Sequence, residues 1–263
     1  YCCYIYSFYS LDITYNTISD KNKDILKELI KTYNNMQYFT TDPVAVVKMC
    51  TEKKDIEIMA VICSWLAYGN RLQINKKCHF AYNLMCGEPY KYLLSKDWQT
   101  YKTDNNSFYR LFKFSDFYNL MNSLYKIYTE HSDLEEYINF FIEQNSNADY
   151  LDALIAGIKA NGIPKNKQSA CKRLCLMLRW LVREDSNVDL GLWKSLDKTK
   201  LYIPLDVHVN RVSRKLGLLK RNATDFKAVQ ELTENCSKYY PEDPTIMDFA
   251  LFGSGYTDKN DIE

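Results

Sequence analysis

The sequence predicts an all-α protein, and three observations lead to that class. Apolar residues make up 46% and charged residues 25% of the 263 positions, a balance that is typical of globular proteins and excludes a disordered chain. Eight Gly and six Pro are too few for the many hairpins of a β-sandwich or barrel. Apolar residues recur at helical spacing along the chain, and no segment with strand periodicity stands out.

Caps and prolines mark the predicted helix starts in the first part of the chain. Pro43 follows Asp42 and opens a short helix, and Asp55 leads a nearly continuous apolar stretch that ends at Gly69 and is expected to be a central helix. A further helix runs from Arg71 toward Cys86, and the aperiodic residues 93–107 are expected to form a loop. The other predicted starts lie at Ser19 or Asp20, Ser115, Asp133 and Ala148.

The later elements are separated by clearer turn signals. The run from Asn161 to Pro164 predicts a hairpin, followed by a helix from about Lys167 to Arg183. Asp206 precedes a helix that runs from Val207 to Leu216 and ends at Gly217. The remaining signals are a cap at Thr224 or Asp225 and Pro244 in the first turn of the last helix. We expect an N-terminal segment with the first helix (1–38), one domain (39–256) of two intertwined lobes (about 39–160 and 161–256), and a tail (257–263).

Cysteine usage and hydropathy indicate a cytoplasmic protein without a membrane segment. The nine cysteines are odd in number and form no CxxC, which favours reduced thiols. Cys171 and Cys175 share a helix face but lack a second Cys or His pair, so no metal or cofactor is expected. The longest apolar run, 58–67, is shorter than the roughly 20 residues that span a bilayer. The opening residues lack the cationic start of a signal peptide.

The net charge is only +1, yet basic residues concentrate in two segments without acidic residues. Residues 157–183 contain seven Lys or Arg, and residues 207–221 contain five. At 100° per residue, Lys172, Arg179 and Arg183 share a helix face, which predicts a basic stripe. The neighbouring hairpin could hold a phosphate on its backbone N–H groups. The alternative is an ordinary solvated helix face.

One motif connects these segments to a known superfamily. The stretch from Pro204 to Val212, followed by Lys-Leu-Gly-Leu at 215–218, resembles the signature of helix-hairpin-helix DNA glycosylases of the endonuclease III type. Asp206, His208 and Arg211 reproduce its D-x-H-x-x-R-V spacing. The resemblance implies a two-lobed glycosylase-like fold in which Asp206 is the catalytic aspartate at a helix N-terminus. The alternative role for Asp206 is that of a helix cap.

Other segments extend the resemblance over most of the chain. Residues 64–71 are similar to the superfamily's loop that fills the gap left by a flipped base, with Tyr68 in the inserting position. Residues 248–253 are similar to its closing helix. From about Phe39 to Tyr256 the chain also resembles a bacterial family of unknown function, number 2400.

The position of the catalytic lysine depends on the alignment. Matching Ser169-Ala170 to the superfamily's T-A places Gln168 at the lysine position, whereas matching the distance to Asp206 selects Lys172. The second spacing is close to that of archaeal 8-oxoguanine glycosylases, and we favour it. Two glycines of the usual hairpin are missing, and no Cys follows Cys236, so no iron–sulfur cluster is expected.

The resemblance implies a monomeric base-excision repair enzyme that binds lesion-bearing double-stranded DNA. It would flip a damaged base, with 8-oxoguanine as one candidate, and cleave the N-glycosidic bond, with AP-lyase activity as a further step through Lys172. The expected DNA contacts are Tyr68, Asn70, Arg71, Lys165, Asn166, Lys167, Arg179, His208 and Arg211. Trp65, Trp180 and Trp193 are candidates for stacking on the base, with core packing as the alternative.

Two other classes of function remain open on the sequence. A non-catalytic helical module could bind branched or damaged DNA, or RNA, through the same hairpin and basic stripe. A protein-interaction scaffold would show no salt-dependent DNA binding.

Overall fold

The computed structural model describes residues 20–184 and 186–260, and their regular structure is mostly helical, which confirms the all-α class. The α-helices are α1 (Asp20–Tyr33), α2 (Pro43–Val47), α3 (Lys53–Leu66), α4 (Arg71–Leu84), α5 (Pro89–Ser95), α6 (Phe114–Glu130), α7 (Leu134–Gln144), α8 (Tyr150–Gly157), α9 (Lys172–Val182), α10 (Val207–Lys215), α11 (Phe226–Ser237) and α12 (Met247–Asn260). The opening segment, for which the sequence predicted no signal peptide, lies outside the described residues, as do Cys2 and Cys3.

Short elements fill several connections. The 3₁₀ helices are η1 (Met36–Tyr38), η2 (Asp97–Tyr101), η3 (Lys198–Lys200) and η4 (Pro244–Ile246), and the strands are β1 (Ser107–Tyr109) and β2 (Phe112–Lys113). The two strands form an antiparallel hairpin in which Tyr109 faces Phe112. The loop predicted over 93–107 is therefore wrong in part. Trp98 is buried and donates its indole N–H to the Leu93 carbonyl, so packing against neighbouring helices orders a segment that lacks its own period.

Helix starts agree with the sequence where a local cap decides them. Asp42, Asp133, Asp206 and Asp225 each accept a backbone N–H bond in the first turn of α2, α7, α10 and α11. Other starts differ from the prediction. Helix α9 begins at Lys172 rather than near residue 167, and α3 and α6 begin at Lys53 and Phe114, ahead of the predicted Asp55 and Ser115. The chain between α8 and α9 is tied down elsewhere, including by a bridge between residues 169 and 225.

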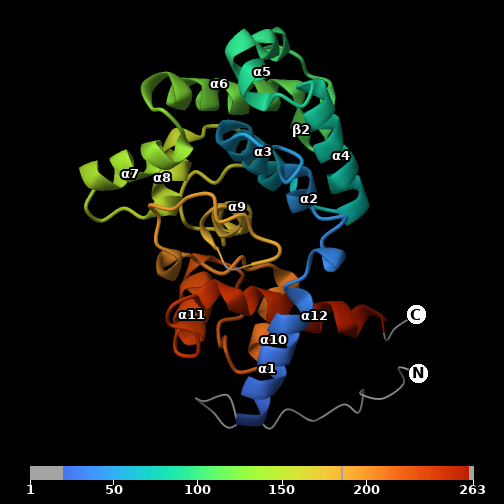
Figure 1. Ribbon diagram of the computed structural model, residues 1–263, viewed down its shortest axis with the longest axis vertical. Helices are drawn as coiled ribbons and strands as arrows, with labels where there is room; N and C mark the ends of the chain where they lie inside the picture. The colour runs from blue at the N-terminus through green and yellow to red at the C-terminus, as the bar shows by residue number, and fades with distance from the viewer. Residues whose placement is uncertain (1–19, 185, 261–263) are drawn as a thin grey trace.

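Helix α3 lies at the centre of the fold, as predicted, and its residues 56–66 are all buried. It packs against α2, α4, α5 and α9. Figure 1 shows α9 end-on in the middle of the molecule, with α3–α8 above it and α1 and α10–α12 below. Helix α12 contacts both α1 and α10 and so closes the lower part. The proposed lobe boundaries stay a prediction.

The predicted basic stripe on α9 is wrong. Arg179 and Arg183 are 2% and 1% exposed, and they pair with carboxylates of the protein that are buried or only partly exposed. Arg179 binds Asp189 and Asp248, whereas Arg183 binds Asp189 and Asp243. Because the later part of α9 is buried, the guanidinium groups of Arg179 and Arg183 need carboxylate partners within the protein. The predicted DNA contact of Arg179 is therefore also wrong.

Two sequence expectations concern thiols and membranes. Every cysteine within the described residues is a free thiol, and all except Cys86 are buried. Among the helices of residues 20–184 and 186–260, none has the length and apolar character to cross a membrane.

Candidate functional site

The N-termini of α9 and α10 meet and bring the two predicted catalytic residues together. Lys172 is the first residue of α9, and Asp206 caps α10 by accepting the Val209 N–H at 2.8 Å. The Lys172 Nζ lies 3.0 Å from Asp206 Oδ2. The side chains are 38% and 29% exposed, so an incoming molecule can reach both partners. Gln168, the alternative to Lys172, is exposed in the α8–α9 loop.

The surroundings keep Asp206 ionised. Burial alone would raise its pKa, but the charge of Lys172 and the hydrogen bond from Val209 outweigh burial and lower the pKa below the ordinary aspartate value. The nearby His208 acts in the same direction. Asp206 is therefore a carboxylate at neutral pH, held in a fixed orientation by an ammonium group and a backbone N–H.

A second carboxylate lies behind this pair on α12. Asp248 is 6% exposed and binds the Arg179 guanidinium. Burial raises the pKa of Asp248 to about 6; the charge of Asp206 adds to the increase, and Arg179 opposes it. The buried side of the Lys172–Asp206 pair is thus a network of charges, whereas its exposed side is open.

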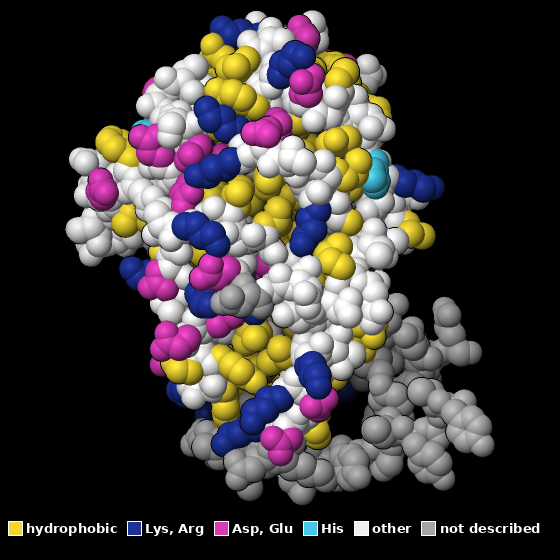
Figure 2. All heavy atoms as spheres, viewed as in Figure 1, with side chains coloured by type: hydrophobic (Ala, Val, Ile, Leu, Met, Phe, Trp, Pro, Cys, Tyr) yellow, Lys and Arg dark blue, Asp and Glu magenta, His cyan; other side chains and the backbone are white. Residues whose placement is uncertain are grey.

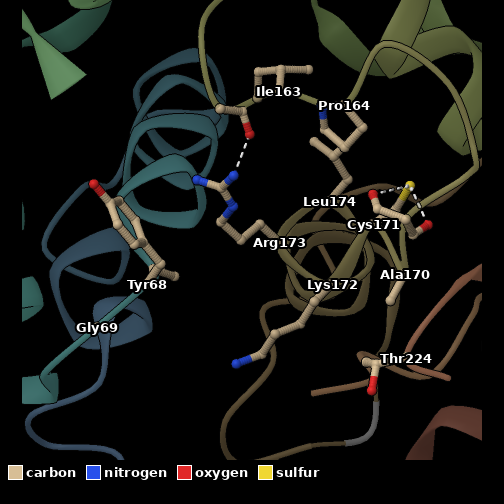
Figure 3. Close-up of a pocket in the computed structure, with 13 residues that line it drawn as sticks. Tyr68, Gly69, Ile163, Pro164, Ala170, Cys171, Lys172, Arg173, Leu174 and Thr224 are labelled. Carbon is tan, nitrogen blue, oxygen red and sulfur yellow. Dashed lines mark hydrogen bonds between the residues drawn. The ribbon is translucent and has the colours of Figure 1, made fainter. Parts of the chain in front are cut away.

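A cavity of about 420 Å³ opens beside Lys172 (Figure 3). Tyr68 and Gly69 line it from the connection between α3 and α4, and residues 162–164 line it from the α8–α9 loop. Thr224 completes the wall, just before α11. In Figure 3, Tyr68 and Thr224 lie on opposite sides of Lys172. The structure thus joins the predicted lysine, the predicted hairpin and the predicted inserting loop at one cavity.

Arg173 holds the two loops of this cavity together. Its guanidinium donates to the carbonyl of Trp65 at 2.7 Å and to that of Gly162. The same group lies 5.5 Å from the Tyr68 ring centroid. Burial lowers the pKa of Arg173. Because its guanidinium donates to backbone carbonyls of both loops, Arg173 has a structural role in the cavity wall.

The other predicted contact residues are not among those that line the cavity. Asn70 caps α4 with its side chain, and Arg71 donates to the Tyr38 carbonyl. The exposed members are Asn70 just before α4, Lys165 and Asn166 in the α8–α9 loop, and His208 and Arg211 on α10. Their predicted contacts with DNA stay predictions.

Lys167 has a different environment from Lys165. Its Nζ lies 2.9 Å from Asp149 and 2.6 Å from Asp152, both at the start of α8. Two carboxylates therefore already offset its charge, which weakens the case for a phosphate contact. Cys171, whose φ is +49°, breaks the helical path that the sequence predicted from residue 167.

The three tryptophans predicted to stack on a base are instead part of the core. Trp65, Trp180 and Trp193 are each 1% exposed or less. Trp65 donates its indole N–H to the Asn161 carbonyl, and Trp193 donates to the Glu57 carboxylate. The stacking prediction is wrong because no ring face is accessible, and core packing is the role that the structure shows.

Sequence reasoning missed Arg173, Thr224 and the β1–β2 hairpin. Arg173 lies in the first acid-free segment, but no sequence pattern distinguishes a buried structural arginine from an exposed one. The hairpin has too few residues for a visible strand period. Within the described residues, no group of three or more His, Cys, Asp or Glu side chains is placed to bind a metal ion.

Comparisons with known proteins give a family but no activity. No curated protein and no solved structure matches the chain. A family model described as "Protein of unknown function (DUF2400)" matches residues 42–257, which include every wall of the cavity and both partners of the Lys172–Asp206 pair. The chain therefore belongs to the DUF2400 family of proteins of unknown function.

Proposed function

We propose that this protein is a DNA glycosylase that flips a damaged base out of the duplex and cleaves its N-glycosidic bond. The observation that carries the proposal is the solvent-accessible Lys172–Asp206 ion pair beside a cavity of about 420 Å³. Small-molecule sites occupy roughly 300–1,000 Å³, so the cavity is large enough for an extruded base. The motif at 204–218, which resembles that of helix-hairpin-helix glycosylases, supports the same reading.

Asp206 supplies the negative charge that base removal needs. When the C1′–N bond breaks, its electron pair leaves with the base and the sugar develops an oxocarbenium-like positive charge. A carboxylate that is fixed and ionised before the reaction stabilises that charge without reorganisation. The Val209 hydrogen bond and the lowered pKa give Asp206 both properties.

Lys172 supplies an amine for the lyase step. As an ammonium group it pairs with Asp206, and it must first transfer one proton to the departing base or to water. The neutral nitrogen then gives its lone pair to C1′ as the C1′–base bond breaks. When the C1′–O4′ bond opens, O4′ takes up a proton from the nitrogen and becomes a hydroxyl, and the C1′–N bond becomes an imine. If water attacks C1′ instead, the product is an abasic site and the strand stays intact.

Replacement of Asp206 by Asn tests the proposal. Asn caps a helix about as well as Asp and keeps the side-chain size, but it removes the charge. We expect base excision from a panel of lesion-bearing duplexes to fall at least a thousandfold, an order typical of lost electrostatic stabilisation. Duplex binding and thermal stability should stay close to wild type.

The chain offers a matched control for this experiment. Asp133 caps α7 through the Glu136 N–H at 2.8 Å and pairs with Lys53 at 2.9 Å, so it repeats the local bonding of Asp206 away from the cavity. Asp133→Asn should therefore leave excision unchanged. If wild type releases no base, or if Asp206→Asn is as active as wild type, Asp206 is only a cap.

Borohydride trapping separates the enzyme from a non-catalytic DNA-binding module. Reduction of an imine joins protein and DNA covalently, and Lys172→Gln should abolish both the adduct and strand cleavage, whereas Lys53→Gln should not. A protein that binds duplexes in a salt-dependent way, without excision or trapping, would instead be a binding module.

A further inference from the structure

The β1–β2 hairpin ends in a two-residue tip formed by Arg110 and Leu111. Leu111 is 82% exposed, more than Val207 at 74% or Leu72 at 59%. A single exposed Leu is ordinary on a protein surface. Here, however, its neighbour Arg110 has a φ of +53°, in the left-handed region that favours glycine. One short turn thus combines backbone strain with an exposed apolar side chain, and such strain is frequent at ligand-binding sites.

The tip stands on a rigid aromatic base. Phe112 stacks on Trp65 with ring centroids 4.4 Å apart, and Phe108 stacks on Phe117 at 4.8 Å. Three of these rings are no more than 2% exposed, and Phe112 is 5% exposed. The strands below the tip are therefore held by the core, and Leu111 has little freedom to fold back and bury itself.

Tyr68 connects the tip to the cavity. Its hydroxyl accepts the Leu111 N–H at 3.2 Å, and its carbonyl accepts the Tyr109 hydroxyl at 2.9 Å. The guanidinium groups of Arg110 and Arg173 lie 5.4 and 5.5 Å from the Tyr68 ring centroid. Tyr68 itself lines the cavity beside Lys172, so the exposed tip lies one side chain away from the candidate site.

We propose that Leu111 is the side chain that enters the DNA stack and fills the space of the base bound in the cavity. This inference rests on the proposed glycosylase function. Apolar side chains inserted between base steps unstack and kink a duplex, and unstacking is part of the cost of flipping a base. Tyr68, which the sequence placed in this role, is bound through both its hydroxyl and its carbonyl, and it supports Leu111 from behind. Arg110 brings a positive charge to the same point.

Fluorescence of 2-aminopurine tests the insertion directly. The probe is a duplex with 2-aminopurine beside the panel lesion that wild type releases fastest. Neighbouring bases quench 2-aminopurine and a leucine side chain does not, so wild type should raise its fluorescence on binding. Leu111→Ala should lose most of that rise and slow single-turnover excision about tenfold. Its affinity for a duplex with a ready-made abasic gap should change less than threefold, because no base has to be displaced there.

Two variants complete the experiment. Leu94→Ala removes the same atoms from a 47% exposed position on α5 and should behave as wild type, whereas Leu111→Met should restore the fluorescence rise. If Leu111→Ala matches wild type in fluorescence and excision, the insertion role is overturned and the glycosylase proposal stands. If wild type excises nothing from the panel, the glycosylase proposal itself fails. Circular dichroism of each variant shows whether the fold is intact.

Discussion

The ion pair of Lys172 and Asp206 has a close counterpart elsewhere in the protein. Lys53 and Asp133 form nearly the same unit, with a capping aspartate bound to a lysine at 2.9 Å. What separates the two is their surroundings, because Lys53 also binds Glu135 and lines a different cavity of about 360 Å³, whereas Lys172 lines the cavity beside the α8–α9 loop. A capping Asp with a Lys partner, even beside a cavity, is therefore weak evidence of catalysis by itself.

Removal of the Lys172 charge should raise the pKa of Asp206. In the folded wild type this pKa is lowered, so Asp206 stabilises the protein above the ordinary aspartate pKa, and that stability is lost as pH falls through the folded value. In Lys172→Met, burial still raises the pKa and the main opposing charge is gone. The carboxyl ¹³C titration of Asp206 should move to higher pH. Lys53→Met should leave Asp206 unchanged and move Asp133 instead, and an unmoved Asp206 in Lys172→Met would contradict the electrostatic role of the pair.

A buried carboxylate on α3 has a different use from Asp206. Glu57 is fully buried and accepts hydrogen bonds from the Tyr128 hydroxyl, the Leu134 N–H and the Trp193 indole. All three donors are neutral, and burial raises the pKa of Glu57 despite them. It joins α3 to α6, α7 and the segment after α9. Trp193 is therefore an anchor of the core, which explains why it cannot serve as a stacking surface.

At the scale of elements, the α8–α9 loop has a glycine, Gly162, that leaves no room for a larger side chain. Gly162 has a φ of +88°, and a Cβ there would lie 2.4 Å from Cζ of Phe112. Gly162→Ala should destabilise the protein by about 2–4 kcal/mol, from left-handed strain plus overpacking. The exposed Gly217, at φ +71°, carries the strain alone, so Gly217→Ala should cost about 1 kcal/mol. Urea midpoints compare the two variants, and equal losses would show that the contact with Phe112 contributes nothing.

Local elements could be predicted from the sequence, and long-range ones could not. The sequence predicts helix starts at Asp133 and at Thr224 or Asp225 because a cap acts within one turn, and the structure has Asp133 and Asp225 as the caps. The late start of α9 follows a left-handed Cys171, in a loop whose Lys167 is bound to α8, and no local pattern encodes these features. Likewise, the motif predicts Asp206 as a catalytic residue, and the spacing to Asp206 predicts Lys172. Their contact, and the hairpin that carries Leu111 to the same cavity, required the three-dimensional structure.

At the scale of the whole molecule, charge is balanced and mixed. The net charge is +1, and Figure 2 shows a face on which basic and acidic side chains are interspersed. Two cations of the first acid-free segment, Arg179 and Arg183, also form ion pairs inside the protein and add no charge to its surface. No broad positive field is needed to explain the proposed binding. A few exposed cations around the cavity would have to supply the phosphate contacts.

The salt dependence of duplex binding should therefore differ between two neighbouring lysines. Lys165 is exposed and forms no ion pair within the described residues, whereas Lys167 is bound to Asp149 and Asp152. If Lys165 contacts a phosphate, Lys165→Ala should reduce the slope of log Kobs against log salt by about 0.9, the value expected for one released counterion. Lys167→Ala should leave the slope nearly unchanged and lower stability instead, because it exposes two aspartates to each other. Equal slopes for both variants and wild type would place the phosphate contacts elsewhere on the surface, with His208 and Arg211 on α10 as the next positions to replace.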